Sequence, residues 1–258
     1  MGKPEKNKAA VRKLTFAAFW NGIRENLFSA FFPEAYVCLD CGKELTDKER
    51  GFSLCDSCRS SLPYITVTRC RFCGEVLEGK YDVCARCQSC PPRYDKAFSP
   101  FSYEGVIRKI ILSYKDGNAN YLYQNIARLL AGYYNSLNLS CDAVCYVPSP
   151  RDRILRRGFE HNRKVAKEFA KWTGLPVIYP LEALKRPDQT KKTREERLKN
   201  IQGAFVRKQE FPREQAQGKK LLLIDDVMTT GATVNECAKL LKDHLGAAEV
   251  FVLTLARS

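Results

Sequence analysis

The stretch LLLIDDVMTTGATV, from Leu221 to Val234, constrains the fold more than any other segment of this chain does. Its four aliphatic residues predict a strand buried on both faces, as in a parallel sheet. Apolar residues then recur at helical spacing from Ala232 to Leu245, and VFVLTL, from Val250 to Leu255, predicts the next strand. We therefore predict an α/β fold with a parallel sheet flanked by helices. Asp225 and Asp226 would lie at the carboxyl end of a strand, where such sheets bind ligands.

The loop after the acidic pair suits a phosphate. It opens the predicted helix, so its backbone N–H groups and the positive end of the helix dipole create an anion site. Gly231 allows a close approach of the backbone to a ligand. The two carboxylates would repel a phosphate but accept hydrogen bonds from neighbouring hydroxyl groups. A phosphate beside a vicinal diol describes a ribose 5-phosphate, and the candidate phosphate ligands are Thr229, Thr230, Gly231, Ala232 and Thr233.

Four Cys-x-x-Cys pairs lie between Cys38 and Cys87. A Cys-x-x-Cys turn points two thiolates at one centre, and two such turns supply the four sulfur ligands of a tetrahedral zinc ion. Gly42 and Gly74 directly follow the first and third pairs, as expected for the tight turn of a zinc ribbon. The spacing predicts a module with two structural Zn²⁺ ions, and the candidate ligands are Cys38, Cys41, Cys55, Cys58, Cys70, Cys73, Cys84 and Cys87.

The spacing leaves the pairing of these cysteines open. Sequential pairing, first with second and third with fourth, is simpler than interleaved pairing, and Cys90 lies close enough in sequence to replace Cys87. A disulfide scaffold is the alternative, but it requires an oxidising compartment. Because a four-thiolate zinc ion has no open coordination position, we expect these ions to stabilise the fold and to play no part in catalysis.

Charge is distributed unevenly along the chain. The formal net charge is +14, and residues 151–200 carry fifteen Lys and Arg against seven Asp and Glu, which is +8 of that total. The segment from Cys38 to Cys87 is neutral, with eight residues of each sign. A basic stretch of this size indicates either a polyanionic partner, such as phosphate, pyrophosphate or nucleic acid, or a solvated helical face.

The N-terminal segment starts basic and then becomes apolar, as a signal peptide does. The apolar run breaks at Asn21, no small-residue cleavage site follows, and the run is too short to span a membrane, so we expect no transmembrane segment and a cytoplasmic protein. Phe16, Trp20 and Ile23 recur at helical spacing. We predict an amphipathic segment at 1–35, the double zinc module at 36–93 and the α/β domain at 94–258.

The stretch from Leu221 to Val234 resembles the signature of type I phosphoribosyltransferases, which bind phosphoribosyl pyrophosphate (PRPP). The resemblance implies that Asp225 and Asp226 hold the ribose hydroxyls. It implies that the loop Thr229–Thr233, called the Thr-Gly loop below, holds the 5-phosphate, and that Mg²⁺ is bound with the pyrophosphate. It also implies a pyrophosphate loop at Ser149, Pro150 and Arg151. The polar segment at 185–200 resembles the flexible loop that closes over the leaving pyrophosphate, and Arg197 fits the pattern there.

The order of motifs narrows the resemblance further. Four Cys-x-x-Cys pairs, VPSPRDRILRRGF, QTKKTREERLKNIQGAF and the ribose-phosphate motif are together similar to the ComF family of competence-associated, amidophosphoribosyltransferase-like proteins. This chain has Glu160 where that family usually has Asn or Asp. The resemblance implies a role in DNA uptake during natural competence, with single-stranded DNA and competence DNA-translocation proteins as candidate partners.

Two functions remain open on the sequence. One is a phosphoribosyltransferase with an unidentified acceptor; the other is a non-catalytic protein that senses PRPP or binds single-stranded DNA. In the second case phosphates would contact Lys and Arg, and bases would stack on aromatic rings. The candidate rings are Tyr114, Tyr121, Tyr123, Tyr133 and Tyr134, which suit a hydrophobic core equally well. The two histidines, His161 and His244, form no triad or metal set, and we predict surface or structural roles for them.

Overall fold

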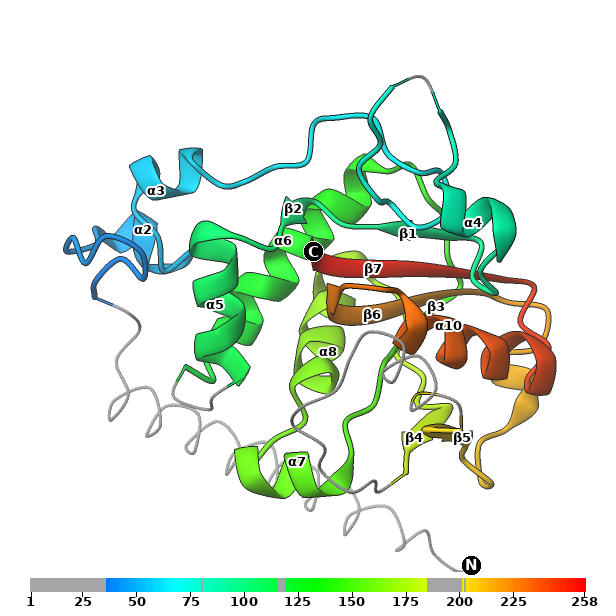
Figure 1. Cartoon of the computed structure of the whole chain (residues 1–258). Coiled ribbons are helices and arrows are strands. Elements are labelled where there is room, and N and C mark those ends of the chain that lie inside the picture. Colours follow the sequence, from blue (N-terminus) through cyan, green and yellow to red (C-terminus); the bar gives the residue numbers. More distant parts are fainter. Residues whose placement is uncertain (1–35, 80, 116–118, 185–200, 202) are drawn as a thin grey trace, which may run out of the picture. The chain divides into compact units, whose positions relative to one another are not determined.

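The computed structural model of the protein describes residues 36–79, 81–115, 119–184, 201 and 203–258 (Figure 1). These residues belong to two compact units, of which the first ends at Asp56 and the second runs from Ser57 to Ser258. The predicted amphipathic segment at 1–35 and the predicted lid at 185–200 lie outside the described residues.

A parallel sheet forms the centre of the second unit. Its strands occur in the order β1–β7–β6–β3, β2 also pairs with β7, and all of these pairs are parallel (Figure 1). The two predicted strands correspond to β6 and β7 of this sheet, so the α/β prediction is confirmed. The strands are β1 (Lys96–Phe98), β2 (Phe101–Ser102), β3 (Ala143–Tyr146), β6 (Lys220–Met228) and β7 (Glu249–Arg257). A separate antiparallel pair consists of β4 (Leu181–Ala183) and β5 (Phe205–Arg207).

Helices cover the sheet. Helix α8 packs on β3 and β6, and α6 packs on α8 and β7. Residues Val165, Ala166 and Phe169 of α8 are buried, and their spacing of one, three and four residues places them on one helical face. Among the described residues from Gly105 onward, the helices are α5 (Gly105–Lys115), α6 (Leu122–Ser136), α7 (Arg151–Arg157), α8 (His161–Thr173), η1 (Arg213–Gln215), α10 (Ala232–Lys239) and η2 (Leu240–His244).

The helix predicted from Ala232 to Leu245 is divided into two parts. Residues Ala232–Lys239 form α10, and Leu240–His244 continue it as a π-helical turn. Val234, Cys237 and Leu241 of these two elements are buried, as the helical spacing predicted. The sequence pattern therefore located the buried face but not the change in helix type.

The hydrophobic core explains why β6 is aliphatic without interruption. Leu221 and Leu223 share a core cluster with Val234 and Cys237 on the α10 side. Successive side chains of a strand point to opposite faces of the sheet, so Leu222 lies on the other face, where it is also fully buried. Burial of one such side chain contributes about 1.5–3 kcal/mol. The strand is covered on both sides, as a parallel sheet requires.

The cysteine-rich segment repeats one turn geometry. In the first turn the backbone N–H of Cys38 donates to Lys43, and that of Gly42 donates to Cys38. Cys70 and Gly74 make the equivalent bonds in the third pair. Both glycines have a left-handed φ, +72° for Gly42 and +69° for Gly74, which a residue with a Cβ rarely adopts. The short helices of this segment are α2 (Asp47–Arg50), α3 (Asp56–Ser60) and α4 (Ala85–Ser89).

Candidate functional site

Asp225 and Asp226 lie in β6 just beyond the end of β3. The pairing of β3 with β6 ends where Tyr146 meets Ile224, whereas β6 and β7 remain paired as far as Met228 and Arg257. The two carboxylates therefore lie at the carboxyl edge of the sheet, as predicted. Both side chains are partly buried, and that of Asp226 is 15% exposed.

Two donors contact one oxygen of Asp226. Nζ of Lys115, the last residue of α5, lies 2.6 Å from Oδ2, and Nε2 of His161, the first residue of α8, lies 3.0 Å from the same atom. Burial alone would raise the pKa of Asp226, but the hydrogen bond from His161 and the charge of Lys115 hold it below its ordinary value. Asp226 is therefore a fixed negative charge with a set orientation.

The pKa of Asp225 is shifted in the opposite direction from that of Asp226. Nδ2 of Asn162 donates to Oδ1 of Asp225 at 2.9 Å and also to the carbonyl of Val147 at 3.0 Å, which links α8 to the end of β3. Burial, and then the negative charge of Asp226, raise the pKa of the Asp225 carboxyl. The adjacent acids thus favour different protonation states, and Asp225 gains most from a ligand that donates hydrogen bonds or carries a cation.

His161 and Asn162 are residues of this site that sequence reasoning missed, and for His161 it predicted a surface or structural role. The side chain of His161 is buried, Oγ of Ser149 lies 3.2 Å and Nη1 of Arg157 3.3 Å from its Nδ1, and its carbonyl accepts a hydrogen bond from Tyr114. Since a guanidinium can only donate, Nδ1 acts as the acceptor and the Nε2–H donates to Asp226. The position of His161 directly after the RGFE motif does not by itself indicate a contact with Asp226. The contact follows only once α8 is placed next to β6.

The Thr-Gly loop leads from β6 into α10. Gly231 is the N-cap of α10 and has a φ of +78°, and its carbonyl accepts the N–H of Asn235. Oγ1 of Thr230 accepts a hydrogen bond from the backbone N–H of Ala232 at 3.3 Å. The loop and the acid pair are therefore successive parts of one strand, turn and helix unit, as the sequence predicted.

Ser149, Pro150 and Arg151 lie between β3 and α7. Pro150 is the N-cap of α7, and Arg151, its first helical residue, is exposed. The backbone N–H of Ser149 donates to Oε1 of Glu160 at 3.0 Å, while Tyr146 donates to the other oxygen of this carboxylate. Ser149 also contacts His161, so the structure brings the predicted pyrophosphate loop next to the partner of Asp226. Arg197 lies outside the described residues.

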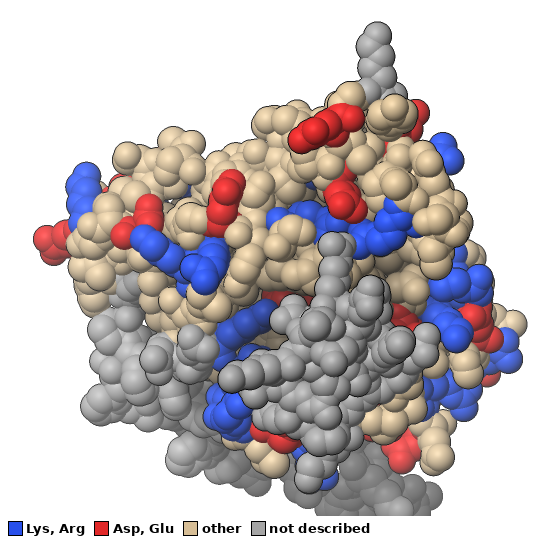
Figure 2. Space-filling view, in the orientation of Figure 1, with Lys and Arg blue, Asp and Glu red and all other residues tan. Residues whose placement is uncertain are grey.

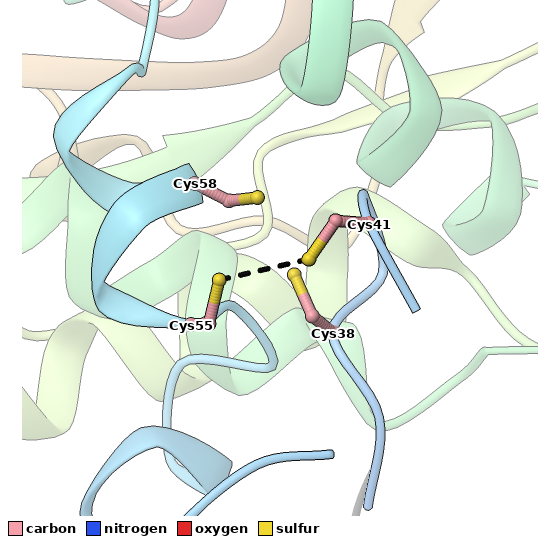
Figure 3. Close-up of side chains that lie close together, drawn as sticks. All are labelled: Cys38, Cys41, Cys55 and Cys58. Atoms are coloured by element: carbon pink, nitrogen blue, oxygen red, sulfur yellow. Dashed lines mark hydrogen bonds between the residues drawn. The ribbon is translucent and has the colours of Figure 1, made fainter. Parts of the chain in front are cut away.

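The eight predicted cysteines form two clusters, paired sequentially. In each cluster the four sulfur atoms lie within 4.8 Å of one another, and Figure 3 shows those of the first pointing toward a common centre. The first cluster consists of Cys38, Cys41, Cys55 and Cys58, and the second of Cys70, Cys73, Cys84 and Cys87. Cys90 is exposed and belongs to neither.

Both clusters fit structural zinc. With Zn–S bonds of about 2.3 Å, tetrahedral ligands lie about 3.8 Å apart, and Sγ of Cys41 lies 3.7 Å from that of Cys55. The Sγ atoms of Cys73 and Cys84 are also 3.7 Å apart. Burial opposes ionisation of the Cys38 thiol, but backbone N–H groups, that of Cys41 foremost, lower its pKa to about 6. Such a thiol loses its proton readily, and the resulting thiolate can bind a metal ion.

The charged and aromatic residues considered for nucleic-acid binding can be located in the described part of the chain. On the face drawn in Figure 2, Lys and Arg side chains occur in several small groups with Asp and Glu side chains among them. Of the five tyrosines considered for base stacking, Tyr114 and Tyr134 are buried in the core. The other three are partly buried. Among the described residues, no helix has the length and apolar character that crossing a membrane requires.

Comparison with protein families places this arrangement in a known class. A model described as double zinc ribbon domain matches residues 27–88, and a model described as phosphoribosyl transferase domain matches residues 118–257. The chain is therefore a phosphoribosyltransferase-domain protein with a double zinc ribbon. Such a domain implies a ligand of the PRPP type.

Curated relatives extend over most of the chain. Competence protein F of Haemophilus influenzae is 30% identical over 239 residues, which cover 86% of this chain and 97% of that protein. Competence protein ComFC of Bacillus subtilis is 28% identical, with 80% and 84% coverage, and DNA utilization protein YhgH of Escherichia coli is 29% identical, with 74% and 85%. The chain belongs to the ComF family.

Proposed function

We propose that this protein binds PRPP or a related ribose 5-phosphate, together with Mg²⁺, at the edge of the sheet beyond β3. The observation that supports this most is the succession of Asp225, Asp226 and the Thr229–Thr233 loop in one strand, turn and helix unit. The loop offers backbone N–H groups at the start of α10, where an anion is favoured. The carboxylates, a few residues earlier, suit the ribose hydroxyls.

Each acid has its own part in this proposal. Asp226, fixed by Lys115 and His161, would accept a hydrogen bond from one ribose hydroxyl, and Asp225 would accept from the other. Among the described residues, no hydrogen-bond donor reaches Oδ2 of Asp225, which leaves this oxygen for the ligand. The oxygen atoms of both carboxylates are hard ligands of the kind that Mg²⁺ prefers. When bound, the ion would neutralise negative charge on the pyrophosphate.

Catalysis is the more specific form of the proposal. In a transfer reaction the bond from ribose C1 to the pyrophosphate oxygen breaks, and a bond from C1 to an acceptor nitrogen forms. Ser149 and Arg151 would contact the departing pyrophosphate, and Arg197 would approach it from the 185–200 segment. At Ser149 the Glu160 carboxylate already accepts the backbone N–H, so a pyrophosphate there must displace it.

A role in handling DNA is the second candidate function. It is supported by the names of the relatives, competence protein F and DNA utilization protein, and by the positive charge of residues 151–200. Single-stranded DNA would bind chiefly through phosphates, and its affinity would fall steeply with salt. This function needs no ribose-phosphate site.

Isothermal titration of PRPP with Mg²⁺ distinguishes these functions. We compare the wild type with the double variant Asp225→Asn/Asp226→Asn and with Asp47→Asn, a control at a carboxylate that is 90% exposed. Binding that only the double variant loses supports the ligand assignment, and no binding by the wild type contradicts it. Release of pyrophosphate, measured with and without single-stranded DNA, decides on catalysis. DNA affinity that depends on salt but is the same in all three proteins indicates a separate DNA site.

A further inference from the structure

The second cysteine cluster (Cys70, Cys73, Cys84 and Cys87) is part of the core of the phosphoribosyltransferase domain. Its four cysteines belong to the same buried cluster as Met228 of β6 and Val234 of α10. The backbone N–H of Ala97 in β1 donates to the carbonyl of Phe72, between two of the cysteines, at 2.7 Å. The metal site and the sheet therefore share one hydrophobic interior.

A series of ion pairs leads from this cluster to the Thr-Gly loop. Nη2 of Arg86 lies 3.6 Å from Sγ of Cys73 and 3.1 Å from Oε2 of Glu75. Nη2 of Arg257 lies 3.5 Å from the same oxygen of Glu75. One carboxylate thus joins an arginine that contacts a metal ligand to an arginine whose side chain is only 6% exposed. Hydrogen bonds of this kind orient metal ligands in many proteins.

Arg257 in turn contacts the start of the loop. Its Nη1 donates to the carbonyl of Met228 at 3.0 Å and to the carbonyl of Thr229. In a trans peptide the C=O and the following N–H point in opposite directions. The N–H groups of Thr229 and Thr230 are therefore directed away from Arg257. This arginine sets the orientation of two peptide groups at the point where the loop leaves the strand.

The segment between the second cysteine cluster and β1 contacts the other end of the loop. A Cβ atom on Gly231 would lie 3.1 Å from the hydroxyl of the buried Tyr94, so the phenol packs directly against the loop backbone. The backbone N–H of Arg93 donates to Oδ1 of Asn235, in the first turn of α10, at 2.7 Å. The loop is held at its start by Arg257, which pairs with Glu75 of the second cysteine cluster's segment, and at its other end by Tyr94 and Arg93, which closely follow that segment.

We propose that Glu75 and Arg257 are positioning residues through which the second cysteine cluster holds the Thr229–Thr233 loop in its anion-binding conformation. The ligand part of this inference rests on the proposed function; the coupling between the ribbon and the loop does not. Its consequence is that a change at Glu75, which lies 154 residues before Thr229 in sequence, alters the affinity for a ribose phosphate. Glu75 and Arg257 themselves need not touch the ligand.

The test uses the full chain with zinc bound and three variants. Glu75→Gln removes the shared carboxylate charge. Arg257→Lys keeps the positive charge but loses the planar fork, whose Nη1 reaches the loop carbonyls while its Nη2 reaches Glu75. Glu78→Gln is the control on an exposed carboxylate in the same segment. For each protein we measure zinc content, hydrogen exchange of the 229–233 amides without ligand, and PRPP affinity with Mg²⁺. We expect exchange about threefold to tenfold faster, and affinity weaker by a similar factor, in the first two variants only.

Several outcomes decide the inference. Equal loop exchange in Glu75→Gln, Arg257→Lys and Glu78→Gln, with two zinc ions bound in each, overturns it. If Glu75→Gln loses zinc, the inference is judged on Arg257→Lys alone, because Arg257 lies in β7, outside the segment that carries the cysteines. If the wild type does not bind PRPP, the proposed function fails, while faster exchange in the first two variants still supports the coupling. Altered exchange with unchanged PRPP affinity contradicts the positioning role.

Discussion

Nε2 of His161 and Nζ of Lys115 contact the same carboxylate oxygen of Asp226, at 3.0 and 2.6 Å. One donor comes from the start of α8 and the other from the end of α5, so two helices fix the orientation of a single acid. The other oxygen, Oδ1, accepts the backbone N–H of Val227 at 2.6 Å. The side chain of Asp226 is oriented before any ligand arrives.

We predict that His161→Ala weakens PRPP binding about fivefold to tenfold, because Asp226 loses one of its donors. His161→Gln, whose amide can still donate, should restore part of the affinity. The control is His244→Ala, at an exposed histidine of η2. Titration calorimetry measures all three. Equal affinities of His161→Ala and His244→Ala would show that the contact with Asp226 has no effect on the ligand.

We predict a pH-dependent gain of stability in Asp225→Asn. Burial, and then the charge of Asp226, raise the pKa of Asp225 to about 7. Above its unfolded pKa of about 3.9, the folded wild type therefore becomes less stable as the pH rises toward about 7, whereas the variant has no such penalty. Its advantage should grow between pH 5.5 and 8 and reach on the order of 2 kcal/mol. Urea unfolding at both pH values measures it, and a pH-independent difference contradicts the prediction.

We predict that Gly231→Ala distorts the Thr-Gly loop. The φ of +78° disfavours a residue with a Cβ, which would also lie 2.7 Å from Cε of Met228. The strain should lower the free energy of unfolding by about 1–2 kcal/mol. The free energy of PRPP binding should weaken by at least the same amount. Gly132→Ala in α6 is the control, since its Cβ meets nothing within 4 Å and the φ is ordinary. Thermal unfolding and titration of both variants check this; an unaffected Gly231→Ala would show that the loop adapts.

We predict that Cys87, and not Cys90, is the fourth ligand of the second cluster. Cys87 is buried with the other three thiols, and Cys90 is exposed outside the cluster. Cys87→Ser should reduce bound zinc from two ions per chain to about one and lower the unfolding temperature, while Cys90→Ser should retain both ions. Metal analysis after gel filtration tests this, and the converse result would reassign the ligand.

Much of the fold could be predicted because its signals are local. The aliphatic run of β6 and the apolar period of α10 follow from residues that are near one another in sequence. The cysteine spacing likewise predicted two four-thiol sites, although the pairing stayed open until the structure placed the first pair beside the second. The assignments of Ser149, Arg151 and Arg197 to a pyrophosphate remain predictions.

The neighbours of the acid pair could not be predicted, because they come from distant elements. His161 lies 65 residues from Asp226 in sequence, and Asn162 lies 63 residues from Asp225. No pattern within α8 distinguishes a histidine that points at a carboxylate from one that points at solvent. The contact exists only because α8 packs against β3 and β6 with its first turn at the edge of the sheet.

The sequence by itself determined the α/β fold, the eight thiols of two metal sites and the acidic strand end with its Thr-Gly loop, since each depends on short-range spacing. Only the tertiary structure decided what surrounds them. Glu75 and Arg257 are 182 residues apart and meet because the second ribbon shares the core of the sheet. Contacts of this kind depend on how buried surfaces fit together, and that fit is a property of the whole folded unit.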